Sequence, residues 1–517
     1  MKQGLIGASF AAAFAIACAV TYAAGPAQAQ KAKDTIRFST SESIKLLDPF
    51  FFTHFEAAPI YRTMYENLVG YDARHHKFVG ILAKSWTSPE PGVYEFDLRD
   101  DVLFSNGDKF DADDVVYFIN FAIDPKTRIH NKPRYLWAKG AEKLGPYKVR
   151  ITVAKPTPKD LLDVGAYTWG ENSKVHKALG ENNESYGRNP IGTGPYKVIE
   201  MESNKAIVMT PNEKFKPGGD GVAARVKRLE AVYIPDQQVQ MAQLMTGGID
   251  IMRDPTPDQV SELSKNPNLA VSSVGSHNMI YLQYDQANRA GNKALSDARV
   301  RKALTMAINR DEMIQHIAAG GTSAKRLDSM CFDDMLACEA TPVAPYKFDP
   351  AQAKKLLAEA GYATGLEIEL ASRQPSKDAA VAVAGYWNAV GVKTSVQLMT
   401  IVTLDKARAD GKLQTYIGER PLTTSDASHV TEIFFLDPRR DYWQDKQMVD
   451  WANEGYTIFD APKRAQHYKK IFDRINEEAM MLPIHTLPSV YIHTKDVKIF
   501  PNPLVDYDTM ISDFGWK

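Results

Sequence analysis

The residue pair with the most specific chemistry is Cys331 and Cys338, in the stretch Cys331-Phe-Asp-Asp-Met-Leu-Ala-Cys338. An even pair of cysteines in an oxidising compartment favours a disulfide that closes a short loop. Two independent thiols, or half of a metal site, are the alternatives. Neither a Cys-x-x-Cys motif nor a histidine cluster accompanies the pair, which argues against zinc.

The remaining reactive side chains form no catalytic motif. His54, His277, His429 and His485 are scattered singly, and a lone histidine is more often structural than a metal ligand. The sequence has no Gly-x-Ser-x-Gly elbow, no His-Glu-x-x-His, no Ser-x-x-Lys with the companion motifs of penicillin-binding enzymes, and no Walker loop. We therefore expect a non-catalytic protein without a cofactor or a bound metal, and keep an exported hydrolase as the rival hypothesis.

The N-terminal residues predict export. A basic start at Lys2, an apolar run from Leu5 to Val20 and the small-x-small site at 27–29 are typical of a secretory signal peptide covering residues 1–29. A membrane anchor is the first alternative, but the run is shorter than the roughly 20 residues of a bilayer span. Lipidation at Cys18 is the second. We expect a periplasmic mature chain, which places the cysteine pair in an oxidising compartment.

Length and composition limit the architecture and the partners. Of the 517 residues, 488 remain after residue 29, which is too many for one compact core and predicts two or three lobes. Apolar residues make up 44% and charged residues 24%, as in an ordinary globular protein. The nearly balanced charge gives no indication of nucleic acid or an anionic membrane as a partner.

Short strands and capped helices succeed one another without a regular βαβ rhythm. Asp111, Asp297 and Asp349 precede apolar stripes of helical period, where an N-cap belongs. Helical spacing also runs from Tyr61 to Leu68. Alternation predicts strands at 35–39, 93–99, 149–153, 230–234, 279–284, 366–371 and 393–398.

An ordered set of sequence blocks resembles the large periplasmic solute-binding proteins of peptide, nickel and opine ABC importers. The resemblance spans nearly the whole mature chain. The blocks are Leu-Ala-Lys-Ser-Trp at 82–86, Tyr-Glu-Phe-Asp-Leu-Arg at 94–99, Val-Leu-Phe at 102–104, Asn-Gly at 106–107, Asp-Ala-Asp-Asp-Val at 111–115, Pro-Ile-Gly-Thr-Gly-Pro-Tyr at 190–196, and further matches at 244–250, 297–310 and 353–362.

This resemblance implies an α/β, two-lobed periplasmic-binding-protein fold of the large class II type with an inserted third subdomain. Lobe I would be discontinuous, over 30–72, 190–276 and 486–517, with the inserted subdomain at 73–189 and lobe II at 277–485. Strands near 277–284 and 482–488 would form the hinge. The lobes are expected to close on a small solute, so that the permease in the inner membrane recognises the closed monomer.

The resemblance also suggests where the solute binds. Ordinary core packing is the alternative for each aromatic residue among the candidates, and mutual pairing or solvation is the alternative for the charged ones. The candidate ligand-binding residues are Phe50, His54, Tyr167, Trp169, His277, Asn278, Arg373, Tyr386, Trp387, Glu419, Arg420 and Thr423.

One loop departs from the pattern of the peptide-binding members. These typically carry Gly-Trp-x-Ala-Asp-Tyr-x-Asp-Pro, in which the Asp pairs with the α-amino group of the peptide. Here 418–427 reads Gly-Glu-Arg-Pro-Leu-Thr-Thr-Ser-Asp-Ala, which puts Leu422 or Thr423 in place of that Asp; Glu419 substitutes only if the strand end shifts. Arg373 and Arg420 suit a carboxylate or another oxyanion. An opine-like or amino-acid-derived acid, an oligosaccharide or a metal chelate is therefore the alternative to a peptide.

Overall fold

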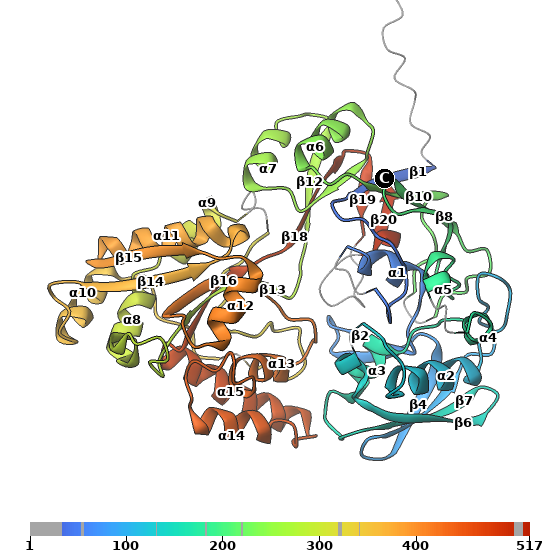
Figure 1. Cartoon of the computed structure of the whole chain (residues 1–517), viewed down its shortest axis with the longest axis horizontal. Helices are drawn as coiled ribbons and strands as arrows, with labels where there is room; N and C mark the ends of the chain where they lie inside the picture. Colours follow the sequence, from blue (N-terminus) through green and yellow to red (C-terminus); the bar gives the residue numbers. More distant parts are fainter. Residues whose placement is uncertain are drawn as a thin grey trace, which may run out of the picture.

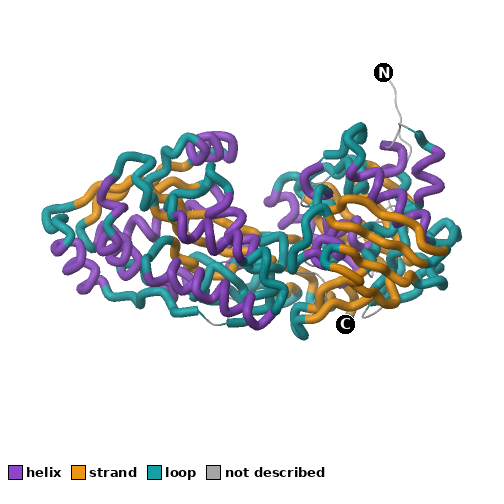
Figure 2. Tube along the Cα trace, turned by 90° about the horizontal axis from the view of Figure 1, so that it is seen from below, coloured by secondary structure: helices purple, strands orange, loops and turns teal. Residues whose placement is uncertain are grey.

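The computed structural model describes residues 34–52, 56–130, 132–180, 184–218, 221–318, 323–340, 342–500 and 510–517. The expected signal peptide and the candidate His54 lie outside these residues. Two bodies lie side by side, each built around its own sheet (Figure 1), and they stay distinct when the molecule is turned by 90° (Figure 2). The predicted two-lobed α/β fold is confirmed.

The lobe I sheet has seven strands in the order β12-β18-β11-β1-β10-β9-β8. Its middle strand, β1, pairs in parallel with β10 and β11, while β18 pairs antiparallel with β11 and β12. The strands are β1 (Thr35–Thr40), β8 (Tyr196–Glu202), β9 (Ala206–Pro211), β10 (Arg228–Tyr233), β11 (Ile251–Arg253), β12 (Leu269–Val274) and β18 (Ser489–Thr494); the helices are α1 (Ala58–Met64), α6 (Gln237–Thr246) and α7 (Pro257–Leu263), and β19 (Val497–Ile499) pairs with β20 (Phe514–Trp516).

The lobe II sheet has five strands in the order β15-β14-β16-β13-β17, with separate apolar clusters that include Tyr281 in one and Leu282 in the other. The side chains of neighbouring residues in a strand point to opposite faces, so one strand serves both clusters. The strands are β13 (Asn278–Tyr284), β14 (Leu366–Ser372), β15 (Val392–Leu398), β16 (Thr415–Pro421) and β17 (Met481–Thr486); the helices are α8 (Ala298–Met306), α9 (Arg310–His316), α10 (Pro350–Glu359), α11 (Lys377–Ala389), α12 (Ile401–Ala409), α13 (Ser428–Thr431), α14 (Lys446–Glu454) and α15 (Ala461–Glu477).

A smaller four-stranded sheet, in the order β4-β5-β7-β6, packs against α2. The cap predicted at Asp111 is confirmed: Asp113 N donates to Asp111 Oδ1 at 2.8 Å, and Asp111 N donates to Asp114 Oδ2 at 3.0 Å. Asp297 and Asp349 likewise cap α8 and α10. The elements are β2 (Val69–Asp72), β3 (Lys77–Gly80), β4 (Ala83–Glu90), β5 (Val93–Leu98), α2 (Ala112–Ile123), β6 (Ala138–Gly145), β7 (Lys148–Val153), α3 (Asp160–Tyr167), α4 (Ser173–Ala178) and α5 (Glu184–Arg188).

Three chain segments interlock where this smaller sheet joins lobe I. The helix predicted over Tyr61–Leu68 is wrong at its end, because α1 stops at Met64 and Tyr65 is extended. Gly194 N donates to Met64 O at 2.8 Å, and Gly170 N donates to Glu66 O at 2.7 Å. A Cβ at position 192 would collide with the Met64 carbonyl, so only glycine allows this approach.

Two short segments, 275–277 and 487–488, carry the chain between the lobe I and lobe II sheets. They are tied to each other: Ser276 Oγ donates to Leu487 O at 2.6 Å, and Leu487 N donates to Asn278 O at 2.7 Å. Short connections of this kind can absorb the backbone rotation of a hinge. The lobe boundaries at 72/73, 189/190, 276/277 and 485/486 remain predictions from the sequence.

Two carboxyl groups are buried close to the interlocked segments. Asp48 and Glu171 are fully inaccessible, and in the described part of the chain neither carboxylate oxygen of Glu171 has a hydrogen-bond partner. Burial raises the pKa of Glu171 well above its usual range, and the charge of Asp48 adds to the rise. Burial also raises the pKa of Asp48 to about 7, against the opposing hydrogen bonds from the Phe50 and Phe51 amides. The fold therefore favours the protonated form of Glu171.

The raised pKa of Glu171 predicts a pH-dependent stability. The folded protein holds a proton that the unfolded chain releases above its ordinary pKa, so the free energy of unfolding falls as the pH rises. Glu171→Gln mimics the protonated group. We expect it to match the wild type at pH 5 and to be about 1–3 kcal/mol more stable at pH 8, measured by urea denaturation. The exposed Glu262→Gln is the control, and an equal pH slope in wild type and Glu171→Gln would contradict the assignment.

Candidate functional site

A pocket lies between α1, α3, the β2–β3 hairpin and the loop that follows β16 of lobe II. It encloses about 1030 Å³, including space open to solvent. Its wall is mainly apolar and includes five aromatic side chains, and Thr423 brings lobe II to its edge. Concave, mostly apolar sites with a few polar groups are typical of small-molecule binding. The aromatic lining residues are Tyr65, Tyr71, Phe78, Trp169 and Phe215.

Helix α3 builds one wall of this pocket through Leu161, Leu162, Gly165 and Ala166. Gly165 lets the helix approach β2, because a Cβ there would lie 2.9 Å from a backbone carbonyl oxygen. The helix ends just before Trp169. The α3 wall and the tryptophan are therefore set by one local packing arrangement.

Glu66 is the pocket-lining carboxyl group. It follows the early end of α1, and its Oε2 is buried without a hydrogen-bond partner among the described residues. Burial raises the pKa of Glu66 to about 8, while a hydrogen bond with Thr193 and the charge of Arg99 lower it and Asp101 raises it. The group is therefore largely protonated at neutral pH.

Two of the candidates from the sequence, Trp169 and Thr423, line this pocket. Trp169 is almost fully buried and meets Tyr61 edge to face, with ring centroids 5.3 Å apart. Thr423 is exposed, at the tip of the loop after β16. The structure thus brings together one residue from each side of the predicted cleft.

Three charged candidates lie on lobe II and outside the lining of the pocket. Glu419 and Arg420 belong to β16, and Arg373 directly follows β14. Burial raises the pKa of Glu419, Arg373 lowers it, and Asp254 of lobe I raises it again.

Other aromatic candidates belong to packed clusters, which supports the core alternative for them. Phe50 stacks on Phe118 with centroids 5.6 Å apart, and Tyr167 packs against Tyr135. Trp387 is completely buried, and its indole Nε1 donates to Leu304 O at 2.9 Å. The sequence alone does not show whether an aromatic residue on a helix face contacts a ligand or the core. Tyr386 packs edge to face on Phe348 in the same lobe.

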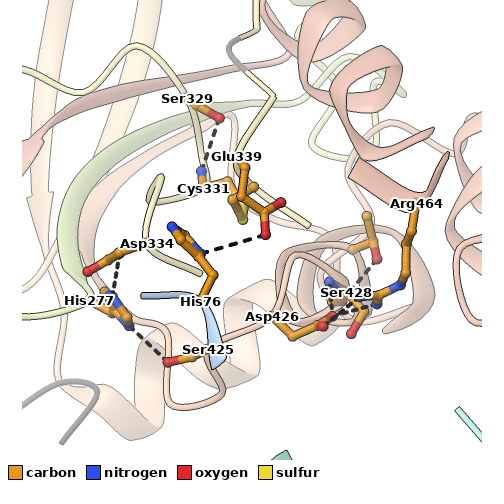
Figure 3. The surroundings of a disulfide bond; sticks show 12 residues. His76, His277, Ser329, Cys331, Asp334, Glu339, Ser425, Asp426, Ser428 and Arg464 are labelled. Atoms are coloured by element: carbon orange, nitrogen blue, oxygen red, sulfur yellow. Dashed lines mark hydrogen bonds and ion pairs between the residues drawn. A yellow bond between two sulfur atoms is a disulfide. The ribbon is translucent and has the colours of Figure 1, made fainter. Parts of the chain in front are cut away.

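His277 and Asn278 lie at the first crossing between the sheets. The His277 ring interacts through Nε2 with Asp334 Oδ1 at 2.8 Å and through Nδ1 with Ser425 Oγ at 3.2 Å (Figure 3). Burial raises the pKa of Asp334, but the hydrogen bond and charge of His277 outweigh it and leave the pKa lowered. His277 therefore ties the hinge to two lobe II loops.

The predicted Cys331–Cys338 disulfide is confirmed, with Cα atoms 5.9 Å apart. The loop that it closes supplies Asp334, and Glu339 follows directly. Glu339 Oε1 lies 3.7 Å from Nδ1 of His76, at the tip of the β2–β3 hairpin (Figure 3). The disulfide loop is thus a point of contact between lobe II and the opposite body.

An ion pair also joins the bodies beside α3. Lys159 Nζ lies 3.8 Å from Glu432 Oε1 of lobe II and 3.4 Å from Asp163 Oδ2. Burial lowers the pKa of Lys159, but Asp163 and Glu432 outweigh it and leave the pKa raised. The side chain is only 17% exposed. This pair links the wall of the pocket to lobe II.

Two features are absent from the described ranges of the chain. No group of three or more His, Cys, Asp or Glu side chains there is placed to hold a metal ion. Likewise, no helix within those ranges is long and apolar enough to cross a membrane.

Comparison with known proteins identifies the family. Residues 77–441 match the model of the bacterial extracellular solute-binding proteins, family 5. The chain belongs to this family.

Other family 5 proteins and solved structures extend the likeness over most of the chain. Heme-binding protein A of Haemophilus influenzae is 26% identical over 462 residues, 81% of each chain. The glutathione-binding protein GsiB of Escherichia coli K12 is 24% identical over 519 residues, 96% of each chain. The structure of HbpA2 from Haemophilus parasuis superposes with a TM-score of 0.79 at 21% identity, covering 93% of this chain and 100% of the other.

Several pocket residues escaped the sequence analysis. Tyr65 and Glu66 fell inside a predicted helix, and Tyr71, Phe78 and Phe215 were not among the candidates. The density of aromatic residues around 61–78 was the available signal, but aromatics at such spacing are equally typical of a core.

Removing the Lys159–Glu432 ion pair should weaken the contact between the two bodies. Lys159→Met keeps the apolar stem and removes the charge, so this solute-binding protein should favour the separated arrangement by about 0.5–1 kcal/mol. Small-angle scattering of the solute-free protein should show a larger radius of gyration than in the wild type. The exposed Lys155→Met is the matched control, and an unchanged radius for Lys159→Met would contradict a closing role.

Proposed function

We propose that this protein is the exported, non-catalytic solute-binding component of an ABC importer, and that it captures its solute in the pocket between the two bodies. The proposal rests on the pocket, because Trp169 from one body and Thr423 from the other line the same space. Membership of family 5 supports the class of function.

Closure follows from the two-sided wall of the pocket. A solute that touches Trp169 and Thr423 together binds the closed arrangement better than the open one, and shifts the population toward it by that difference in affinity. The paired segments at 275–277 and 487–488 would absorb the rotation. The permease in the inner membrane would then receive the closed receptor, which we expect to act as a monomer in the periplasm.

The loop after β16 favours a solute other than an ordinary peptide. Thr423 lines the pocket, and the family pattern puts Leu422 or Thr423 where the peptide-binding members carry Asp. Unless the strand end shifts and Glu419 substitutes, a free α-amino group would meet no carboxylate at that position. Arg373 and Arg420 offer guanidinium groups on lobe II for a carboxylate. An amino-acid-derived or opine-like acid fits these groups, and a relative that binds glutathione supports a small acidic solute.

A thermal-shift screen tests this function. Peptides, opines, sugars, aromatic acids and metal chelates are added singly, and a matching solute should raise the melting temperature and quench tryptophan fluorescence. The solute recovered afterwards should be chemically unchanged, because turnover would favour the exported hydrolase.

Variants then locate the binding site. The exposed Thr423→Trp should fill the mouth of the pocket and reduce the affinity at least tenfold without loss of folding. Trp169→Ala should also reduce the affinity by removing a wall, with a loss of stability because Trp169 is buried. Trp451→Ala, on α14 of lobe II, is the control. A solute that binds Thr423→Trp and Trp169→Ala as tightly as the wild type would place the site elsewhere.

A further inference from the structure

One hydrogen-bond acceptor in the described lining of the pocket is buried without a partner. Glu66 Oε2 is buried and has no partner among the described residues, although the carboxyl group lines the pocket. A buried carboxyl oxygen without a hydrogen bond costs free energy, and native proteins leave few such atoms without a reason. An incoming donor is the group that would satisfy it.

The walls around Glu66 favour a donor that carries positive charge. Tyr65, Tyr71, Phe78 and Trp169 line the same space, and the faces of aromatic rings attract cations. A cationic nitrogen would therefore gain from the rings and from the carboxylate together. A neutral hydroxyl would gain only one hydrogen bond.

We propose that Glu66 makes this pocket selective for solutes that present a cationic nitrogen, a primary ammonium or a guanidinium, whose N–H donates to Oε2. The inference rests on the proposed function and names the chemical class that the pocket accepts. It gives the amino group of the solute a partner on the lobe I side, in place of the aspartate that the loop after β16 lacks.

Burial is the main cause of the raised pKa of Glu66, and the charged groups nearby modify it without replacing this role. Arg99 and Asp101, after β5, form an ion pair at 3.0 Å, and Lys216 lies 4.0 Å from Asp101. Arg62, one turn earlier on α1, also lines the pocket and makes contacts of its own. Because the pKa of Glu66 is raised to about 8, an arriving cation must displace its proton.

Binding of the cation is therefore coupled to proton release. Below about pH 8 the affinity should rise close to tenfold for each pH unit, and it should level off above that pH. A solute without a cationic nitrogen should show no such slope. The affinity rises with pH because raising the pH deprotonates Glu66 and so supplies the carboxylate that the cation needs.

Matched pairs of solutes test the selectivity. Tyramine and tyrosol differ in an ammonium against a hydroxyl group, and arginine and citrulline differ in a guanidinium against a urea group. Isothermal titration of the full mature chain should show the cationic member of each pair binding at least tenfold more tightly. Glu66→Gln keeps the size of the side chain and should abolish this preference, whereas the exposed Glu262→Gln should keep it.

A second measurement guards against a variant that misfolds. Titration of tyramine into the wild-type protein in two buffers of different ionisation enthalpy should reveal release of about one proton near pH 7. Equal affinities within both pairs, no binding of either cationic member, or tyramine binding without proton release would each overturn the proposal. A screen solute that loses affinity in Thr423→Trp but binds Glu66→Gln unchanged would overturn it while leaving the proposed function standing.

Discussion

The pocket depends on the close contact of three backbone segments at the end of α1. Residues around Met64, Gly170 and Gly192 approach so closely that side chains at the two glycines would strike the neighbouring chain, and backbone hydrogen bonds join the segments at 2.7–2.8 Å. Tyr65, Glu66 and Trp169 all project from this contact or lie beside it. Their relative positions are therefore set by backbone packing, which changes little when lobes move.

The contacts across the gap are of a different physical kind. His76–Glu339 is a histidine–carboxylate contact at 3.7 Å and Lys159–Glu432 is an ion pair at 3.8 Å. Partly exposed polar contacts of this kind are individually weak. Each lobe, by contrast, keeps its own apolar clusters. Strong packing within each lobe and weak contacts between the bodies suit a receptor. The two bodies stay folded, while a change in their relative orientation costs little free energy.

The sequence predicted the architecture better than the site, and particular residues show why. The caps at Asp111, Asp297 and Asp349 are local signals, and the cysteine pair needed only its spacing and compartment. Trp387 is packed inside lobe II, and the sequence does not distinguish this from a ligand contact because the same amphipathic spacing serves a core and a binding face. Glu66 was missed because no local signal in Tyr61–Leu68 indicates that α1 ends at Met64. A tertiary contact of Met64 with the segment at Gly192–Gly194 favours that end.

The order of strands in the lobe I sheet also has a consequence for folding. Strand β18, from near the C-terminus, lies between β11 and β12, which come more than 200 residues earlier. The lobe II sheet draws its strands from one continuous stretch, 278–486. Lobe II can thus assemble from contiguous chain. The lobe I sheet, in contrast, is incomplete between β11 and β12 until β18, near the C-terminus, has been synthesised. The complete pocket, which takes Thr423 from lobe II, requires both bodies to be folded.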